Sequence, residues 1–454
     1  MRLQGLAPPL VDPIAATIGS VVRLAGPAIA HQLLLTLVFM ADRALVGRLG
    51  PEALASMQVS TTIAWTLLSI LGATSIGITA VVTRLVGAGD RKRAAVAARD
   101  AVLRTGLAAT AVAIVLFLAD GALLSLCFPR VAPAVLAQAE RYLAVALLAL
   151  PIGAVEAGLA ASLQAAGDTT TPLWAATVAN VVNLVASVVL IFGVGPIPAL
   201  GVAGAALGSF AAFTIQAAWQ WRALHRPGSP LPFAAVADAK ERRSLRRRFH
   251  RVTLPALAER LLYQGGYLGY VALIALLGVG AMAANQAIIS IEAMSYQTAE
   301  GFGVAASVLV GQHLGRRDGG EGLSLWLSAG LAAAALAGFS LVFLAAPAAL
   351  LRLFSDDPQV VATGLAPLKL AALSQPIMAF AVVASMALRA AGETKTLLAI
   401  TAISGVGLRL VATYVFTAVF PLGLFGVWLA STLDWTLHAV LVVAVLLRGR
   451  WRHR

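Results

Sequence analysis

Acidic residues inside long apolar stretches are the first candidates for chemistry in this sequence. Asp42 lies near the end of an apolar run that starts around residue 14, in the segment VFMADRALVGRLGPEAL at residues 38–54. If this run crosses a bilayer, a carboxylate in it costs about 2.5–3.5 kcal/mol even on lenient insertion scales. Asp42 is therefore a candidate for binding a cation or a proton. An acid this close to a helix end can also pair with Arg43 or Arg48, and the position alone leaves both interpretations open.

A polar stripe in the apolar run 172–193 could supply further ligands. Asn180, Asn183 and Ser187 are spaced i, i+3 and i+7, which places them on one face of a helix. Amide and hydroxyl oxygens beside one carboxylate suit a hard monovalent cation. The same side chains also serve as hydrogen bonds between membrane helices, so the stripe is compatible with either role.

The second half of the chain has its own acids in apolar runs, namely Glu259, Glu292, Glu300 and Asp434. Glu292 lies near the middle of the run 283–310 and has no basic residue three or four positions away. An unpaired carboxylate at this depth predicts a functional role. We expect Glu292 to carry a second proton or to act as a counter-charge for cationic substrates.

Two arginines lie in apolar runs and are candidate partners for these acids. Arg260 is adjacent to Glu259, which makes an ion pair between them the simplest interpretation, and Arg409 is a candidate partner for Glu292 or Glu300. The predicted substrate site or second coupling site consists of Glu292, Glu259, Glu300, Tyr296 and Gln264.

The composition indicates what surrounds these residues. Of the 454 residues, 60% are hydrophobic and 12% charged, and the mean hydropathy is +0.88. Soluble domains are about 25% charged, so the chain is predicted to be an all-α polytopic membrane protein. The apolar runs predict twelve transmembrane helices, at residues 15–42, 55–82, 94–118, 134–163, 172–193, 201–222, 252–279, 283–310, 322–347, 360–388, 396–417 and 424–447.

Signatures of enzymes and of ATP-driven pumps are missing. The sequence contains no HExxH, GxSxG or GxxxxGK[ST] motif, and its six histidines have no metal-ligand spacing. The lone Cys127 excludes an internal disulfide and a cysteine-based metal site. We therefore expect no enzyme activity, no cofactor, and no metal beyond a possible sodium ion at Asp42.

The basic residues predict the orientation of the chain. With a cytoplasmic N-terminus, 25 of the 33 Lys and Arg residues fall on the cytoplasmic side, which agrees with the positive-inside rule. We expect a multi-pass protein of the cell (inner) membrane with both termini cytoplasmic and no cleavable signal at residues 1–13. The pI near 10.9 has the same explanation and does not indicate nucleic acid binding. The basic segment 222–251 is either a simple linker or a site for anionic lipids or a partner.

The two halves of the sequence resemble each other. LQAAGDTTT at 163–171 recurs as LRAAGETKT at 388–396, and VTRLVG at 82–87 aligns with VGQHLG at 310–315. The offsets are 225 and 228 residues, which indicates a duplication of six spans in the same orientation. We predict an N-lobe at 1–222, a cytoplasmic linker at 223–251 and a C-lobe at 252–454 around a central cavity. The C-half equivalent of Asp42 is Tyr270, so the acid is confined to one lobe, which favours the ion site over a shared structural role.

Three motifs in order carry a family resemblance. They are D-x-x-x-V-G-R-L-G-P-x-A-L-A at 42–55, V-T-R-L-V-G-A-G-D at 82–90, and L-x-A-A-G-[DE]-T at the ends of the fourth and tenth spans. With the six-plus-six layout, the chain resembles the multidrug and toxic compound extrusion (MATE) family. The resemblance implies two six-helix lobes, a V-shaped cavity, and export of organic cations or other amphiphiles against entering protons or sodium ions.

The resemblance also implies a specific ion site. The archaeal-type branch of the family binds its cation with residues that align to Asp42, Asn183, Ser187 and Ser209. The second aspartate of that branch is Ser187 here, so Asp42 would be the lone carboxylate, and proton and sodium coupling both remain open.

The expected function is therefore a secondary active multidrug exporter that works as a monomer in the lipid bilayer on small organic substrates. The alternative is a flippase for lipid-linked or polysaccharide precursors. A flippase would be expected to have extra spans and several arginines in its cavity, and the sequence predicts neither.

Overall fold

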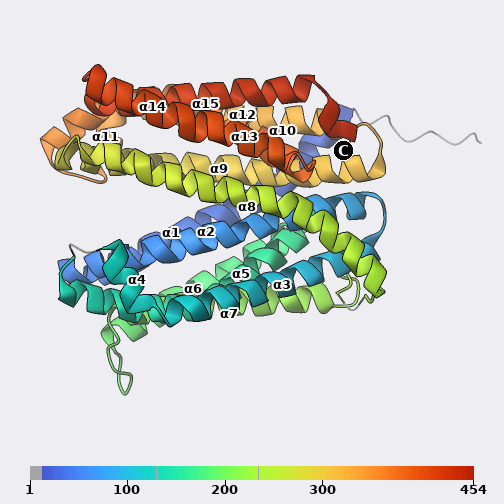
Figure 1. Cartoon of the computed structure of the whole chain (residues 1–454), viewed down its shortest axis with the longest axis horizontal. Helices are drawn as coiled ribbons and strands as arrows, with labels where there is room; N and C mark the ends of the chain where they lie inside the picture. Colours follow the sequence, from blue (N-terminus) through green and yellow to red (C-terminus); the bar gives the residue numbers. More distant parts are fainter. Residues whose placement is uncertain (1–12, 129–130, 234, 454) are drawn as a thin grey trace, which may run out of the picture.

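The computed structural model describes residues 13–128, 131–233 and 235–453, and these form a helical molecule (Figure 1). The predicted absence of a signal at residues 1–13 falls mostly outside the described residues. The helices of the first part are α1 (Pro13–Gly47), α2 (Pro51–Gly87), α3 (Arg91–Phe117), α4 (Asp120–Cys127), α5 (Pro133–Ala165), α6 (Thr170–Phe192) and α7 (Val202–His225). The second part contains α8 (Ala239–Ala275), α9 (Val279–Arg316), α10 (Glu321–Ala345), α11 (Pro347–Arg352), α12 (Pro358–Ala390), α13 (Thr394–Thr401), η1 (Ala402–Leu408), α14 (Arg409–Tyr414), η2 (Val415–Val419), α15 (Gly423–Leu447) and η3 (Arg450–His453).

The predicted all-helical membrane architecture is confirmed. Within the described residues, ten helical segments are long and apolar enough to cross a membrane. Helices α8 and α9 are not among them, although they contain 37 and 38 residues and run alongside the others. The charged residues singled out in the sequence explain this, since α8 contains Glu259 and Arg260, and α9 contains Glu292 and Glu300.

The eleventh predicted span is less regular than expected. Instead of one helix over 396–417, the segment Thr394–Val419 alternates between α-helix and the two π-helical stretches η1 and η2. Gly405 and Gly407 lie in η1, and Arg409 follows it directly. Wider π-helical turns are often found at functional sites, and here they flank a largely buried arginine. The short helices α4 and α11, which follow α3 and α10, were not predicted.

The helices form two groups, α1–α7 and α8–α15, which lie one above the other in Figure 1. We call them the N-half and the C-half. The first helix of each half packs against the second helix of the other half, so α1 lies along α9 and α8 lies along α2. The interface between the halves is therefore made by the same pair of helices from each repeat.

Close packing of α2 on α9 depends on glycine. A Cβ atom at Gly87 would overlap the backbone of Gln312, and one at Gly315 would overlap the backbone of Arg84. Gly311 likewise leaves no room for a Cβ beside Thr83. We call these four positions, Thr83, Gly87, Gly311 and Gly315, the glycine seam. At the repeat offset of 228, Thr83 corresponds to Gly311 and Gly87 to Gly315, so the seam is nearly symmetric.

Two hydrogen bonds beside the glycine seam follow the same symmetry. Arg84 Nη2 donates to the carbonyl of Ala391 at 2.8 Å, and Gln312 Nε2 donates to the carbonyl of Ala165 at 3.3 Å. Arg84 and Gln312 are repeat equivalents, and both acceptors lie in the matched LQAAG and LRAAG segments. Helix α2 of the N-half thus binds the C-terminal end of α12, and helix α9 of the C-half binds the C-terminal end of α5.

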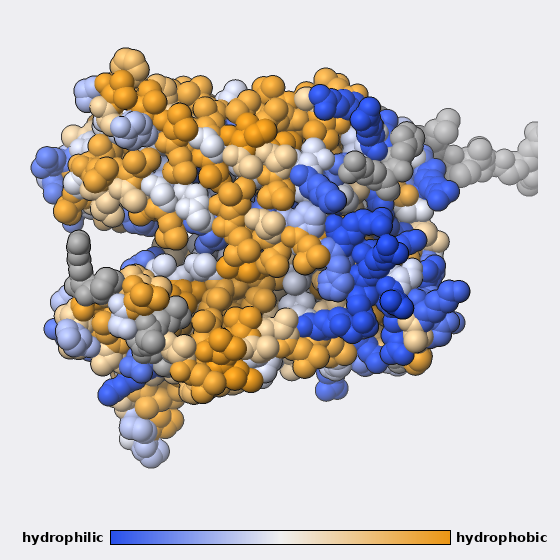
Figure 2. Space-filling model, viewed as in Figure 1, coloured by the Kyte–Doolittle hydropathy of each residue, from blue (hydrophilic) through white to orange (hydrophobic). Residues whose placement is uncertain are grey.

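The surface separates into an apolar body and a hydrophilic end. Figure 2 shows the hydrophilic surface at the end where α8 begins and where the C-terminus lies, and a notch between the halves at the opposite end. The glycine seam closes the molecule at the hydrophilic end, since it joins the last turns of α2 and α9. The predicted cytoplasmic position of this end stays a prediction. Arg2 and Arg454, which count toward the cytoplasmic side, and Arg130, which counts toward the opposite side, lie outside the described residues.

The basic segment predicted as a linker is partly helical. Helix α8 starts at Ala239 with Asp238 as its cap, whose side chain accepts a hydrogen bond from Glu241 N at 2.7 Å. The preceding loop is held down, because Phe233 is buried and its carbonyl accepts from Arg99 Nη1 at 2.9 Å. The described part of this segment therefore packs on the N-half.

Candidate functional site

Asp42 lies in the last two turns of α1 and is buried, with only 2% of its surface exposed. Ser187 Oγ on α6 donates to its Oδ1 at 3.0 Å, and Ser209 Oγ on α7 donates to its Oδ2 at 3.2 Å. No basic side chain in the described part of the chain forms an ion pair with Asp42. The alternative of a surface pair with Arg43 or Arg48 is therefore wrong for this structure.

The amide of Asn183 completes this cluster. Its Nδ2 donates to Ser209 Oγ at 3.4 Å, while its Oδ1 is buried and has no hydrogen-bond partner. Asn180 lies apart from the cluster, because its Nδ2 donates to the carbonyl of Leu34 on α1 at 3.0 Å. The structure thus brings together four of the five predicted residues, and the fifth joins α6 to α1.

The approach of α6 and α7 at this cluster requires a glycine. A Cβ atom at Gly208 would overlap Ser187 Oγ, so only glycine allows Ser187 and Ser209 to reach the same carboxylate. In the C-half the equivalent position of Asp42 is the buried Tyr270, over whose ring the Arg409 guanidinium lies at 5.5 Å. One half therefore buries an acid without a cation, and the other half places an arginine on an aromatic ring.

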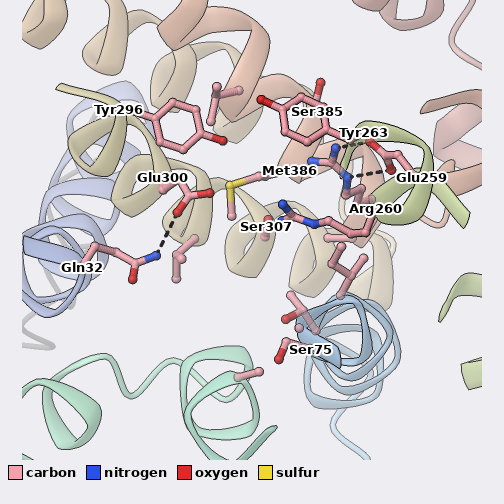
Figure 3. Close-up of a pocket in the computed structure, with 18 of the residues that line it drawn as sticks. Gln32, Ser75, Glu259, Arg260, Tyr263, Tyr296, Glu300, Ser307, Ser385 and Met386 are labelled. Carbon is pink, nitrogen blue, oxygen red and sulfur yellow. Dashed lines mark hydrogen bonds and ion pairs between the residues drawn. The ribbon is translucent and has the colours of Figure 1, made fainter. Parts of the chain in front are cut away.

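A central cavity of about 370 Å³ lies between the two halves. Both halves line it with polar and charged side chains, including His31, Gln32, Ser75, Glu156, Glu259, Arg260, Tyr263, Tyr296, Glu300, Arg389, Arg409 and Asp434. Part of this lining is labelled in Figure 3. Asp42 is not among its lining residues, so the acidic cluster and the cavity are separate places that share helix α1.

Glu259 lines this cavity, but the expected pairing with Arg260 is wrong. Its carboxylate forms an ion pair with Arg389 on α12 and accepts a hydrogen bond from Thr401 Oγ1 at 2.9 Å. Adjacent residues of a helix point about 100° apart, so Glu259 and Arg260 face different neighbours. Arg389, which lies just beyond the predicted span 360–388, is the last basic residue of α12 and lines the cavity.

Arg409 pairs with neither Glu292 nor Glu300, so that expectation is also wrong. Its Nη2 lies 2.7 Å from Asp434 Oδ2 and donates to Ser431 Oγ at 3.2 Å. The pair is largely buried, with side-chain exposures of 12% for Arg409 and 3% for Asp434. Both partners come from the last helices of the C-half.

Glu292 lies away from the cavity. Gln375 Nε2 on α12 donates to its Oε1 at 3.0 Å, and Gln375 in turn accepts from Ser295 Oγ at 2.6 Å. Glu292 is not a lining residue of the cavity, and this placement does not favour a counter-charge role. Gln264 is also outside the lining and donates to Thr66 Oγ1 on α2 at 3.4 Å.

Glu300 and Tyr296 do line the cavity. Gln32 Nε2 on α1 donates to Glu300 Oε2 at 3.2 Å, which makes a contact between the halves (Figure 3). Gln297 strengthens the same junction, because its Nε2 donates to the carbonyl of Gln32 and to Thr36 Oγ1, both at 3.2 Å.

Sequence reasoning missed Glu156, a buried acid of the N-half that lines the cavity. Gln220 Nε2 on α7 donates to its Oε1 at 2.9 Å. The signal was present, since Glu156 lies deep in the apolar run 134–163 and the argument made for Glu292 applies to it equally. His438 was also missed, and it lies between Ser385 Oγ at 3.0 Å and Ser404 Oγ at 3.1 Å.

Comparisons with known proteins agree on one group of transporters. The model of the family described as MatE matches residues 27–189 and 255–415, one segment in each half. A relative described as a probable multidrug resistance protein NorM, from Thermotoga maritima, is 28% identical over 95% of this chain and 93% of its own length.

Solved structures with the same fold cover nearly the whole chain. A MOP superfamily transporter from Pyrococcus furiosus has a TM-score of 0.87 at 18% identity and covers 97% of this chain and 96% of its own. A mutant of the MATE transporter VcmN from Vibrio cholerae has a TM-score of 0.85 at 19% identity, with coverage of 97% and 100%. At these identities the likeness is one of fold.

Proposed function

This chain belongs to the MATE family of transporters, and from its two polar sites we propose that it is a secondary active exporter of amphiphilic organic compounds. In this proposal, protons or sodium ions enter the cell at Asp42 and drive substrate out of the central cavity. The observation that carries the proposal is a buried, unpaired carboxylate on a helix that also lines a cavity between the halves.

The chemistry at Asp42 supports binding of a single positive charge. A carboxylate buried without a cation is costly, and a proton or a sodium ion relieves that cost. The oxygens of Ser187 and Ser209 and the unpartnered Oδ1 of Asn183 are the ligand type that hard cations prefer. We propose these four residues as the coupling-ion site, with Asn180 in a positioning role.

Helix α1 is the proposed connection between the ion and the substrate. Leu35 of α1 lines the cavity, and Asp42 lies seven residues further along, about 10 Å away at 1.5 Å per residue. Asn180 fixes this stretch of α1 to α6, and Gln297 fixes it to α9. Ion binding that shifts α1 would therefore change both the cavity wall and the interface between the halves, and the ion gradient biases the two states by its differential affinity for them.

The orientation and domain assignments belong to the same proposal. We propose that the hydrophilic end and both termini face the cytoplasm, and that the lobes divide at the segment 223–251. The notch between the halves would then open to the outside. In that state, the cavity can release its substrate and Asp42 can take up the ion.

Efflux from proteoliposomes tests the central claim. Under an imposed proton or sodium gradient, Asp42→Asn is expected to abolish gradient-driven efflux at unchanged protein abundance, because an amide cannot be protonated to a neutral acid or supply a charge. The exposed acid Glu52 provides a matched control, and Glu52→Gln should transport as the parent does. Normal gradient-driven efflux by Asp42→Asn would refute the proposal. Gradients of each ion, applied separately, identify the coupling ion.

A flippase is the second candidate, and one observation favours it. The expectation of a cavity without several arginines is wrong, since Arg260, Arg389 and Arg409 all line the cavity. Two of the three are neutralised by acids, which favours the exporter. Movement of a fluorescent lipid-linked precursor between leaflets, independent of any ion gradient, would support the flippase instead.

A further inference from the structure

The repeat relates two contacts across the cavity. Helices α1 and α8, and likewise α2 and α9, align at a constant offset of 228 residues. Gln32 therefore corresponds to Arg260, and Gly72 corresponds to Glu300. On one side of the cavity, Gln32 donates to Glu300. On the other side, Arg260 has a glycine where its partner would be.

Arg260 consequently makes no direct contact with an acid, although its charge acts at longer range on Glu259 and Glu300. Within the described residues it forms no hydrogen bond and no ion pair, while the other two cavity arginines are held by Glu259 and Asp434. Its side chain extends away from Glu259 in Figure 3, toward Ser307. Arg260 lies eight residues into the predicted span 252–279, roughly 12 Å along the helix at 1.5 Å per residue, where a cation without a direct partner is costly.

Open space and apolar surface line the same cavity as this arginine. Gly72 lines the cavity, and a Cβ atom there would meet no atom within 4 Å. Tyr263, Tyr296 and Met386 also line the cavity. Aromatic rings and a methionine side chain provide an adaptable surface for flat apolar groups.

We propose that Arg260 and the space beside Gly72 form an anion subsite, which selects amphiphiles that carry a carboxylate. The guanidinium takes the carboxylate in a bidentate pair, a geometry that arginine matches well. The apolar part of the substrate packs against Tyr263, Tyr296 and Met386. This inference rests on the proposed function, in that the cavity is taken as the substrate site, and it narrows the substrate class from amphiphilic organic compounds in general to acids and zwitterions.

The repeat itself supplies the test variants. Arg260→Gln installs the residue found at the equivalent position 32, and it removes the charge. Gly72→Glu installs the residue found at position 300, and it supplies Arg260 with a partner of its own. Arg260→Lys keeps the charge and loses the bidentate geometry, so it should retain part of the affinity for a carboxylate.

Equilibrium binding of a matched pair of probes measures the subsite directly. Anthracene carboxylic acid and its methyl ester are fluorescent and differ only in the charge, and both are titrated onto the purified full-length protein in nanodiscs. Arg260→Gln and Gly72→Glu are each expected to weaken binding of the acid by about tenfold or more, as for loss of a charge-assisted hydrogen bond, and to leave the ester nearly unchanged. Unchanged binding of the ester also shows that the variants are folded.

Two results would overturn the inference. One is an equal loss of affinity for acid and ester in Arg260→Gln. The other is that only an anionic lipid displaces the bound acid from the parent protein, which would make Arg260 a site for lipid headgroups. Efflux of the ester under an ion gradient tests the exporter separately. If the acid–ester difference holds but no efflux follows either gradient, the exporter proposal fails and the subsite stands.

Discussion

The glycine seam predicts that one added methyl group opens the hydrophilic end of the molecule. In Gly87→Ala, the new Cβ would lie 2.7 Å from both the Cα and the carbonyl carbon of Gln312. Carbon atoms normally approach to about 3.5–4.0 Å, so α2 and α9 must move apart by about 1 Å. The clash is with backbone atoms, which cannot rotate away as a side chain can.

The magnitude follows from this overlap. Overpacking of a well-packed contact costs typically about 1–3 kcal/mol. Separation of the helices also lengthens the hydrogen bonds from Arg84 to Ala391 and from Gln312 to Ala165. A shift of this size changes the ratio of open to closed molecules by roughly 5–150-fold.

Thiol labelling of a buried position measures the opening. Ala391 is fully buried beside the seam, so Ala391→Cys in a Cys127→Ser background reports access to this end by its rate of reaction with a membrane-impermeant maleimide. Gly87→Ala should raise that rate by about fivefold or more. Gly330→Ala on α10 is the control, because a Cβ there meets no atom within 4 Å. Equal rates for the parent, Gly87→Ala and Gly330→Ala would refute the reasoning.

Three further substitutions test other parts of the structure. Arg409→Leu leaves Asp434 buried and unpaired and should cost about 3–5 kcal/mol of stability, whereas the double variant Arg409→Leu/Asp434→Leu should recover most of it; thermal unfolding of the purified protein decides, and an equally unstable double variant would contradict the pairing. Ser187→Asp adds a second carboxylate beside Asp42 and should raise the sodium dependence of efflux if the coupling ion is sodium, while no change argues for protons. Glu292→Gln should alter efflux of cationic and neutral substrates to the same extent, because Glu292 does not line the cavity, and a selective loss of cation efflux would instead support a counter-charge role for Glu292.

The sequence predicted the fold well because bilayer thickness and hydropathy determine the length and position of the transmembrane helices. The twelve apolar runs correspond to the long helical segments, and the repeat identified α8 and α9 as equivalents of α1 and α2 despite their charges. The Asp42 cluster could be predicted because helix geometry determines which residues share a face. The spacing of Asn183 and Ser187 placed them on one helix face, and the family resemblance added Ser209.

The ion pairs of the C-half could not be predicted from the sequence. Arg389 and Glu259 lie 130 positions apart, and Arg409 reaches Asp434 from the next helix, so each pair depends on how the helices pack. Proximity in sequence suggested Arg260 for Glu259, but neighbouring residues of a helix diverge. Glu156 is a different case, since its position deep in an apolar run is evident from the sequence alone.

The packing of the first helix of each half against the second helix of the other half has a consequence for how the protein is made. The contact of Gln32 with Glu300 joins residues 268 positions apart. Since ribosomes add about 5–20 residues per second, α9 is synthesised on the order of 10–60 s after α1. During that time the polar groups of Gln32 and Thr36 have no C-half to bind, and they lie in a helix already committed to the membrane. The N-half is therefore expected to be most vulnerable to quality-control proteases before α9 emerges, and chains truncated ahead of α9 should be degraded even though they contain a complete set of N-half helices.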